Sequence, residues 1–141
     1  MKDRLHDAIL RVVESPPLKR IVRSVRSHEN DRSWYWTSGG CFAFAEALVK
    51  VLGGELYVVA QLCDDDWSAQ HAIMKYRGQY YDATGLVTEK HLIATYGWTT
   101  SAVRIGSVNN WDSELPLWYP DQEFVTDEEI DLICTLLRKE L

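Results

Sequence analysis

A helix enclosed by two pairs of glycines constrains the fold of this chain more than any other feature. Residues 41–52 read CFAFAEALVKVL, a run rich in alanine and leucine, which are strong helix formers. Gly39 and Gly40 precede this run, and Gly53 and Gly54 follow it, where glycine commonly ends a helix. We therefore predict one helix over residues 41–52, with a cysteine in its first turn.

The segments around this helix predict an α+β fold. We expect helices over residues 3–13, 17–27, 89–96 and 126–139, and strands over residues 56–62, 71–76, 79–82 and 102–105. Residues 63–67 indicate an acidic surface loop. Because N-terminal helices come first and a run of strands follows, the order favours one helix packed on an antiparallel sheet, with a closing C-terminal helix. A chain of 141 residues fits a single domain over residues 1–141.

Charge and composition exclude several classes of function. Residues 1–33 carry eight Lys/Arg against five Asp/Glu, whereas residues 34–141 carry seven against sixteen, so the body of the chain is acidic. An acidic body argues against general nucleic-acid binding. No apolar run is long enough to cross a membrane, and the first residues lack the apolar core of a secretory signal, so we expect a cytoplasmic protein. The basic stretch 19–26 is either a solvated helix face or a contact for an anionic partner, and we favour the former.

Cys41 is the cysteine with the best setting for reactivity. Three widely spaced cysteines do not make a disulfide framework. The first turn of a helix offers unpaired N–H groups and a positive dipole end, which stabilise a thiolate and can also bind an oxyanion. The alternative is a small buried apolar side chain, which is common for cysteine.

His71 and Asp82 strengthen the chemical interpretation of Cys41. If Arg77 and Gly78 form a two-residue hairpin loop, the histidine and the aspartate lie on the same face as diagonal neighbours, within reach of a hydrogen bond. The aspartate would then fix the imidazole tautomer, and the second ring nitrogen would face the thiol. The alternatives are an edge-strand histidine and an aspartate that merely begins a turn.

The pattern Gly40-Cys41-x-x-x-Ala45, followed by His71-Ala72 and by Asp82-x-Thr84, resembles the transglutaminase-like branch of the papain-like cysteine enzymes. That family places its cysteine at a helix N-terminus, its histidine on a following strand and its aspartate on the next strand. The resemblance implies a papain-like core, with Cys41 as nucleophile, His71 as general base and acid, and Asp82 as the orienting acid. Phe42, Ile73 and Ala83 depart from residues that the family often has at these positions.

These observations predict a thiol-dependent acyl-transfer enzyme: a cysteine peptidase, an amidase or deamidase, or a transglutaminase-type enzyme that forms a thioester intermediate. Trp34, Trp36 and Gly40 precede the nucleophile and are candidates for substrate binding, although aromatic residues of this kind also pack in cores. We expect a protein or peptide substrate, no cofactor and no metal, because no pair of residues has zinc-ligand spacing. The alternative is a non-catalytic binding or inhibitory protein on the same fold that caps a partner protein.

Overall fold

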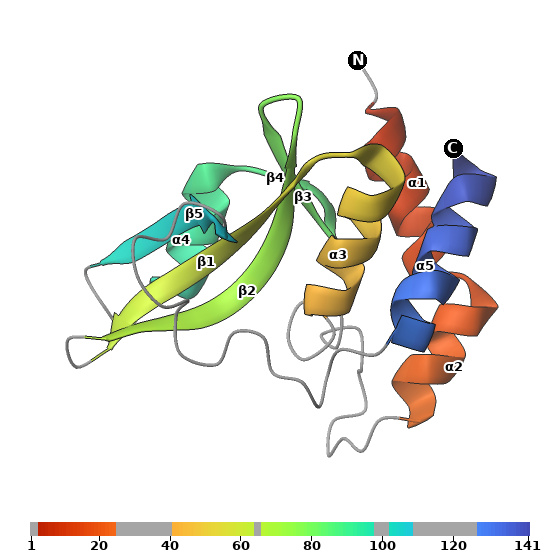
Figure 1. The fold of residues 1–141 in the computed structure, drawn as a ribbon, viewed down its shortest axis with the longest axis horizontal. Coiled ribbons are helices and arrows are strands. Elements are labelled where there is room, and N and C mark those ends of the chain that lie inside the picture. Colours follow the sequence, from red (N-terminus) through yellow and green to blue (C-terminus); the bar gives the residue numbers. More distant parts are fainter. Residues whose placement is uncertain (1–2, 25–40, 64–65, 98–101, 109–126) are drawn as a thin grey trace.

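The computed structural model describes residues 3–24, 41–63, 66–97, 102–108 and 127–141, and shows an α+β fold (Figure 1). The helices are α1 (Arg4–Val13), α2 (Pro16–Ser24), α3 (Cys41–Leu52), α4 (Glu89–Tyr96) and α5 (Asp127–Glu140). The strands are β1 (Glu55–Cys63), β2 (Asp66–Tyr76), β3 (Gln79–Asp82), β4 (Gly85–Val87) and β5 (Val103–Ser107). The predicted α+β class and the closing C-terminal helix are therefore confirmed.

The five strands form one antiparallel sheet in the order β4-β3-β2-β1-β5. The long β1–β2 hairpin is its centre, and β4 and β5 are its edges. The pairing of β1 with β2 shifts between Val59 and Ala60, because Val59 pairs with His71 whereas Ala60 pairs with Ala69. This bulge lies directly beside His71, and bulges commonly re-aim a side chain.

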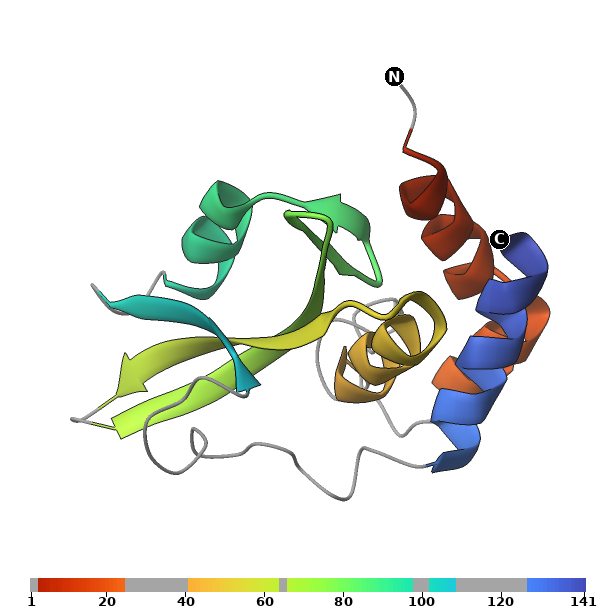
Figure 2. The ribbon, with the colours of Figure 1, turned by 45° about the horizontal axis from the view of Figure 1, so that its top comes forward.

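Helices cover both faces of the sheet. Successive residues of β2 point to opposite faces, and Met74 packs with α1, α3 and α5, whereas Ile73 packs with Leu92 of α4. In Figures 1 and 2, α3 lies between the sheet and the layer that α1, α2 and α5 form, and α4 lies on the other side of the sheet. The larger core therefore lies between the sheet and the helical layer, and a smaller core lies under α4.

The β2–β3 turn sets the register on which the candidate site depends. Tyr76 pairs with Gln79, and Met74 pairs with Tyr81, as the sequence predicts. Arg77 and Gly78 both have positive φ, at 52° and 78°. Both central residues of a type I′ turn need this conformation, which glycine adopts freely and arginine only at a cost.

Two predicted elements need correction. Residues 63–67 were expected to be a loop, but β1 runs through Cys63 and β2 begins at Asp66. Residues 64 and 65 lie outside the described residues. Pairing with β1 extends the second strand back to Asp66, although aspartate has low strand propensity. The short edge strand β4 was not predicted, because three residues give too little alternation to identify a strand.

None of the helices in the described part of the chain is long and apolar enough to span a membrane. Cys134 lies on the buried side of α5, within the larger core. Burial raises the pKa of its thiol.

Candidate active site

Cys41 is the first residue of α3, and its side chain is buried against the sheet. It packs with Phe42 and Ala45 of the same helix and with Ala72 of β2. Ala72 directly follows His71 along β2, so this contact brings the start of the helix to the histidine's strand. The small alanine side chains at these two positions allow the helix and the strand to approach closely.

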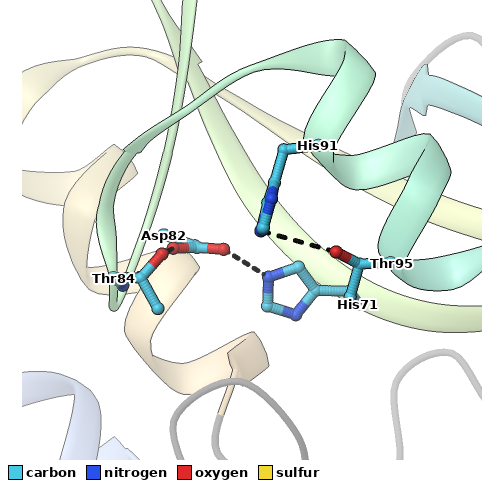
Figure 3. A network of polar contacts seen from close by, with 5 residues as sticks. All are labelled: His71, Asp82, Thr84, His91 and Thr95. Carbon is cyan, nitrogen blue, oxygen red and sulfur yellow. Dashed lines mark hydrogen bonds and ion pairs between the residues drawn. The ribbon is translucent and has the colours of Figure 1, made fainter.

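His71 and Asp82 form a buried hydrogen bond. The imidazole Nε2 lies 2.7 Å from the carboxylate Oδ2, and the two residues are 0% and 5% exposed to solvent. Figure 3 shows the ring with one nitrogen directed at the carboxylate and the other directed away from it. The predicted diagonal relationship across β2 and β3 therefore places these two side chains in contact.

Thr84 holds the other oxygen of the carboxylate. Oδ1 of Asp82 accepts a hydrogen bond from the Thr84 backbone N–H at 2.8 Å and a second from the Thr84 hydroxyl. Burial raises the pKa of Asp82, but the hydrogen bond and charge of His71, together with Thr84, outweigh burial and bring this pKa below its ordinary value. The carboxylate is therefore fixed in position and ionised at neutral pH.

Opposing influences act on the pKa of His71. Burial disfavours the charged ring, but the hydrogen bond to Asp82 and the hydrogen bonding and charge of Cys41 outweigh it and raise the pKa of His71 to about 9. Within the described residues, Nδ1 has no hydrogen bond of ordinary geometry. Since Nε2 is engaged by Asp82, Nδ1 is the nitrogen left to face Cys41.

Tyr96 covers the imidazole ring. The two rings are stacked, with centroids 4.9 Å apart and an angle of 16° between their planes. Burial, together with the charges of Asp82 and Cys41, raises the pKa of the Tyr96 hydroxyl above its ordinary value. Sequence reasoning missed both Tyr96 and the role of Thr84. A threonine two residues after an aspartate is a signal for the latter, since such residues commonly donate to the aspartate side chain.

The remaining candidate residues fall outside this geometry. Trp34, Trp36 and Gly40 lie outside the described residues. His91 is exposed on α4. Its Nε2 lies 3.4 Å from the Thr95 hydroxyl (Figure 3). Within the described ranges, no three His, Cys, Asp or Glu side chains converge in a way that could hold a metal ion.

The three residues together have the parts that acyl transfer requires. A thiol at a helix start lies beside an imidazole, and a carboxylate orients the ring from its other side. The ring nitrogen that does not contact the carboxylate has no ordinary hydrogen bond within the described part of the chain. A fixed carboxylate that accepts from one ring nitrogen leaves the other free to give or take a proton. This geometry is compatible with the predicted roles, which stay predictions.

Comparison with protein families assigns the chain. The family model of Phage YunG-like protein matches residues 18–130, which include all three candidate residues, so the chain belongs to the Phage YunG-like family. The assignment to the transglutaminase-like branch of the papain-like enzymes is therefore wrong. Three residue types in a common order on common elements were too unspecific to identify a family. The comparisons with curated proteins and with solved structures found no match.

Proposed function

We propose that this member of the Phage YunG-like family is a thiol-dependent acyl-transfer enzyme, with Cys41 as nucleophile, His71 as the proton carrier and Asp82 as the orienting acid. The observation that carries the proposal is the buried His71–Asp82 hydrogen bond, which occupies Nε2 of the ring and leaves Nδ1 available to Cys41. Among the described residues this buried nitrogen has no hydrogen bond of ordinary geometry, and buried polar atoms of that kind concentrate at functional sites.

In the first half-reaction, the Cys41 thiolate attacks a carbonyl carbon and forms a carbon–sulfur bond. The negative charge moves to the carbonyl oxygen, where the positive dipole end at the start of α3 can stabilise it. When the intermediate collapses, the bond to the leaving amine breaks and Nδ1 of His71 donates its proton to that amine. The products are a free amine and a thioester on Cys41, with the imidazole neutral.

In the second half-reaction, the neutral imidazole accepts a proton from water or from an acceptor amine. The activated oxygen or nitrogen attacks the thioester, and the carbon–sulfur bond breaks to release the acyl group and restore the thiolate. Asp82 stays ionised throughout and stabilises the imidazolium each time it forms. The scissile bond in these steps is an amide or an isopeptide; in a thioester substrate a thiolate would leave in place of the amine. A protein or peptide is the proposed substrate.

Chemical labelling tests this assignment. The protein is treated with limiting iodoacetamide at neutral pH, and the adducts are mapped by mass spectrometry. We expect labelling of Cys41 at least about tenfold faster than that of the buried Cys134, because a thiolate is the reactive form. His71→Ala should abolish the difference, whereas His91→Ala, which alters an exposed histidine outside the site, should preserve it.

A second measurement covers the case in which burial of Cys41 slows the labelling reagent. p-Nitrophenyl acetate should produce a burst of p-nitrophenol and an acetyl group on Cys41, both lost in Cys41→Ala and in His71→Ala. Equal, slow labelling of all three cysteines, together with the absence of an acetyl adduct, would contradict the enzyme. That result would favour the alternative, a binding protein that caps a partner.

A further inference from the structure

The first turn of α1 contacts the hairpin that carries the orienting acid. Asp82 and Gly85 pair across the tight turn between β3 and β4, and Tyr81 and Leu86 are the next pair outward. Asp82 and Thr84, which bond to each other, both lie within this turn. The conformation of the turn therefore sets the direction of the carboxylate toward His71.

Two side chains of the α1 start hold this hairpin from outside. Asp3 Oδ2 accepts a hydrogen bond from the Tyr81 hydroxyl at 2.7 Å. Nδ1 of His6 accepts one from the Leu86 backbone N–H at 2.8 Å. Asp3 Oδ1 also caps α1 by accepting from the His6 backbone N–H at 2.9 Å. The Asp3 side chain is thus tied to the backbone of His6, and each of the two side chains holds one strand of the hairpin.

The third contact is a close approach that only glycine permits. A Cβ atom on Gly85 would lie 2.1 Å from Nδ1 of His6, and the φ of Gly85 is +95°. The imidazole therefore lies directly on the backbone of the turn. His6 is half-buried in this contact.

The hairpin needs such support because β4 is a three-residue edge strand. It pairs with β3 alone, and an isolated short hairpin has marginal stability in water. The His6 imidazole accepts a hydrogen bond from the Leu86 N–H. This N–H points away from β3 and would otherwise be an unpaired group at the edge of the sheet. Because catalytic geometry tolerates displacements of well under 1 Å, support of this turn bears directly on the site.

We propose that Asp3 and His6 are positioning residues that fix the Asp82 turn, so that α1 determines the alignment of the carboxylate with the His71 imidazole. This inference rests on the proposed function for its importance to catalysis, but its geometric content stands apart from any reaction. The residues act through the hairpin backbone and do not contact the thiol or a substrate.

The test uses variants that remove the contacts of His6 and of Asp3 separately. His6→Ala removes the acceptor for Leu86 N–H, and His6→Asn restores one, because the Asn side-chain oxygen can occupy a position close to that of Nδ1. Tyr81→Phe removes the hydroxyl that donates to Asp3, and with it a weaker contact to Gln79 Oε1 at 3.1 Å, while preserving the ring. Ile9→Val, a buried change farther along α1, is a control that removes one methyl group from the larger core but neither hydrogen bond to the hairpin.

The deciding measurement is the pKa of His71, followed by NMR titration of its ring. We expect His6→Ala and Tyr81→Phe each to lower this pKa by about half a unit to one unit, because a displaced carboxylate stabilises the imidazolium less well. His6→Asn should restore the wild-type value, and Ile9→Val should leave it unchanged. An unchanged His71 pKa in both His6→Ala and Tyr81→Phe, at reduced stability, would overturn the proposal and assign these contacts to folding alone.

Labelling of Cys41 in the same variants separates this proposal from the proposed function. If wild-type Cys41 is unreactive but the His71 pKa still responds to His6→Ala, the positioning role holds and the enzyme fails. If Cys41 is reactive and neither its labelling rate nor the His71 pKa responds, the enzyme holds and the positioning role fails.

Discussion

His71 is charged at neutral pH although it is fully buried, and this state depends on its partners. Burial alone would favour the neutral ring, so the imidazolium exists because Asp82 accepts its Nε2–H and Cys41 lies nearby. A buried charge of this kind loses its stabilisation when one partner is removed, and removal is then strongly destabilising. The site is therefore sensitive to changes of single atoms.

Asp82→Asn should lower the pKa of His71 from about 9. The substitution removes the charge of Asp82, so that only Cys41 still opposes the effect of burial. NMR titration of the ring gives the value directly. Thr84→Val is the matched control: it removes one donor to the carboxylate but preserves the charge, so it should lower the pKa much less. A His71 pKa that stays near 9 in Asp82→Asn would show that the charged ring does not depend on Asp82.

Stability in acid should depend on the same carboxylate. The pKa of Asp82 is below its ordinary value of 3.8 in the folded protein. The folded state therefore binds its proton less readily than the unfolded state, and Asp82 stabilises the protein above about pH 3.8. This contribution is lost as the pH falls through the lower folded-state value. In urea titrations at several pH values, the stability difference between wild type and Asp82→Asn should therefore narrow below pH 3.8. A stability difference that does not change with pH would contradict the lowered pKa of Asp82.

At the scale of elements, the sequence predicts those helices and strands whose start and end signals lie in neighbouring residues. The helix Cys41–Leu52 and the short helix Glu89–Tyr96 have the predicted bounds, because glycines bound the first and Thr88 caps the second. The start of β2 and the strand β4 depend instead on pairing with strands elsewhere in the chain. The residues 66–70 and 85–87 have no alternating pattern that would indicate a strand. The start of β2 and the strand β4 could therefore not be identified from their own residues.

The residues of the candidate site also divide into those that the sequence could place together and those that it could not. His71 and Asp82 could be placed together because one hairpin register relates them, and that register follows from a two-residue turn. The contacts of Tyr96 with His71 and of His6 with Leu86 could not be predicted, because each depends on the packing of a helix against the sheet. Such contacts depend on tertiary structure, which spacing along the chain does not encode.

The β2–β3 turn gives a prediction in which adjacent substitutions have opposite effects. Arg77→Asn should raise the free energy of unfolding by up to about 1 kcal/mol, because asparagine tolerates the positive φ of 52° better than arginine does. Gly78→Ala should lower it by about 1 kcal/mol: a Cβ there meets no atom within 4 Å, so only the φ of +78° opposes it. Urea midpoints measure both effects. Destabilisation by Arg77→Asn would show that the contact between Arg77 and the Tyr76 ring, 5.1 Å from its centroid, outweighs the strain.

At the scale of the whole molecule, α3 belongs to both the site and the core. Its first residue is the candidate nucleophile, and its buried residues Phe44, Ala47 and Leu48 pack in the cluster that α1 and α5 complete. The hairpin with the orienting acid is held by α1 on the same side. The helical layer therefore supports both the thiol and the acid, and we expect its unfolding to disrupt both together.

Leu137→Ala tests whether sheet and helical layer form one cooperative unit. Leu137 is 0% exposed on α5 and lies in the larger core, so its truncation should lower the free energy of unfolding by about 2–5 kcal/mol. Because the layer and the sheet share this core, urea transitions followed by far-UV circular dichroism and by tryptophan fluorescence should coincide in wild type and shift together in the variant. Lys139→Ala, an exposed change on the same helix, should leave the midpoint within about 0.5 kcal/mol of wild type. Two separate transitions would show that the sheet folds without α5, and the nucleophile helix would then not depend on the closing helix for its position.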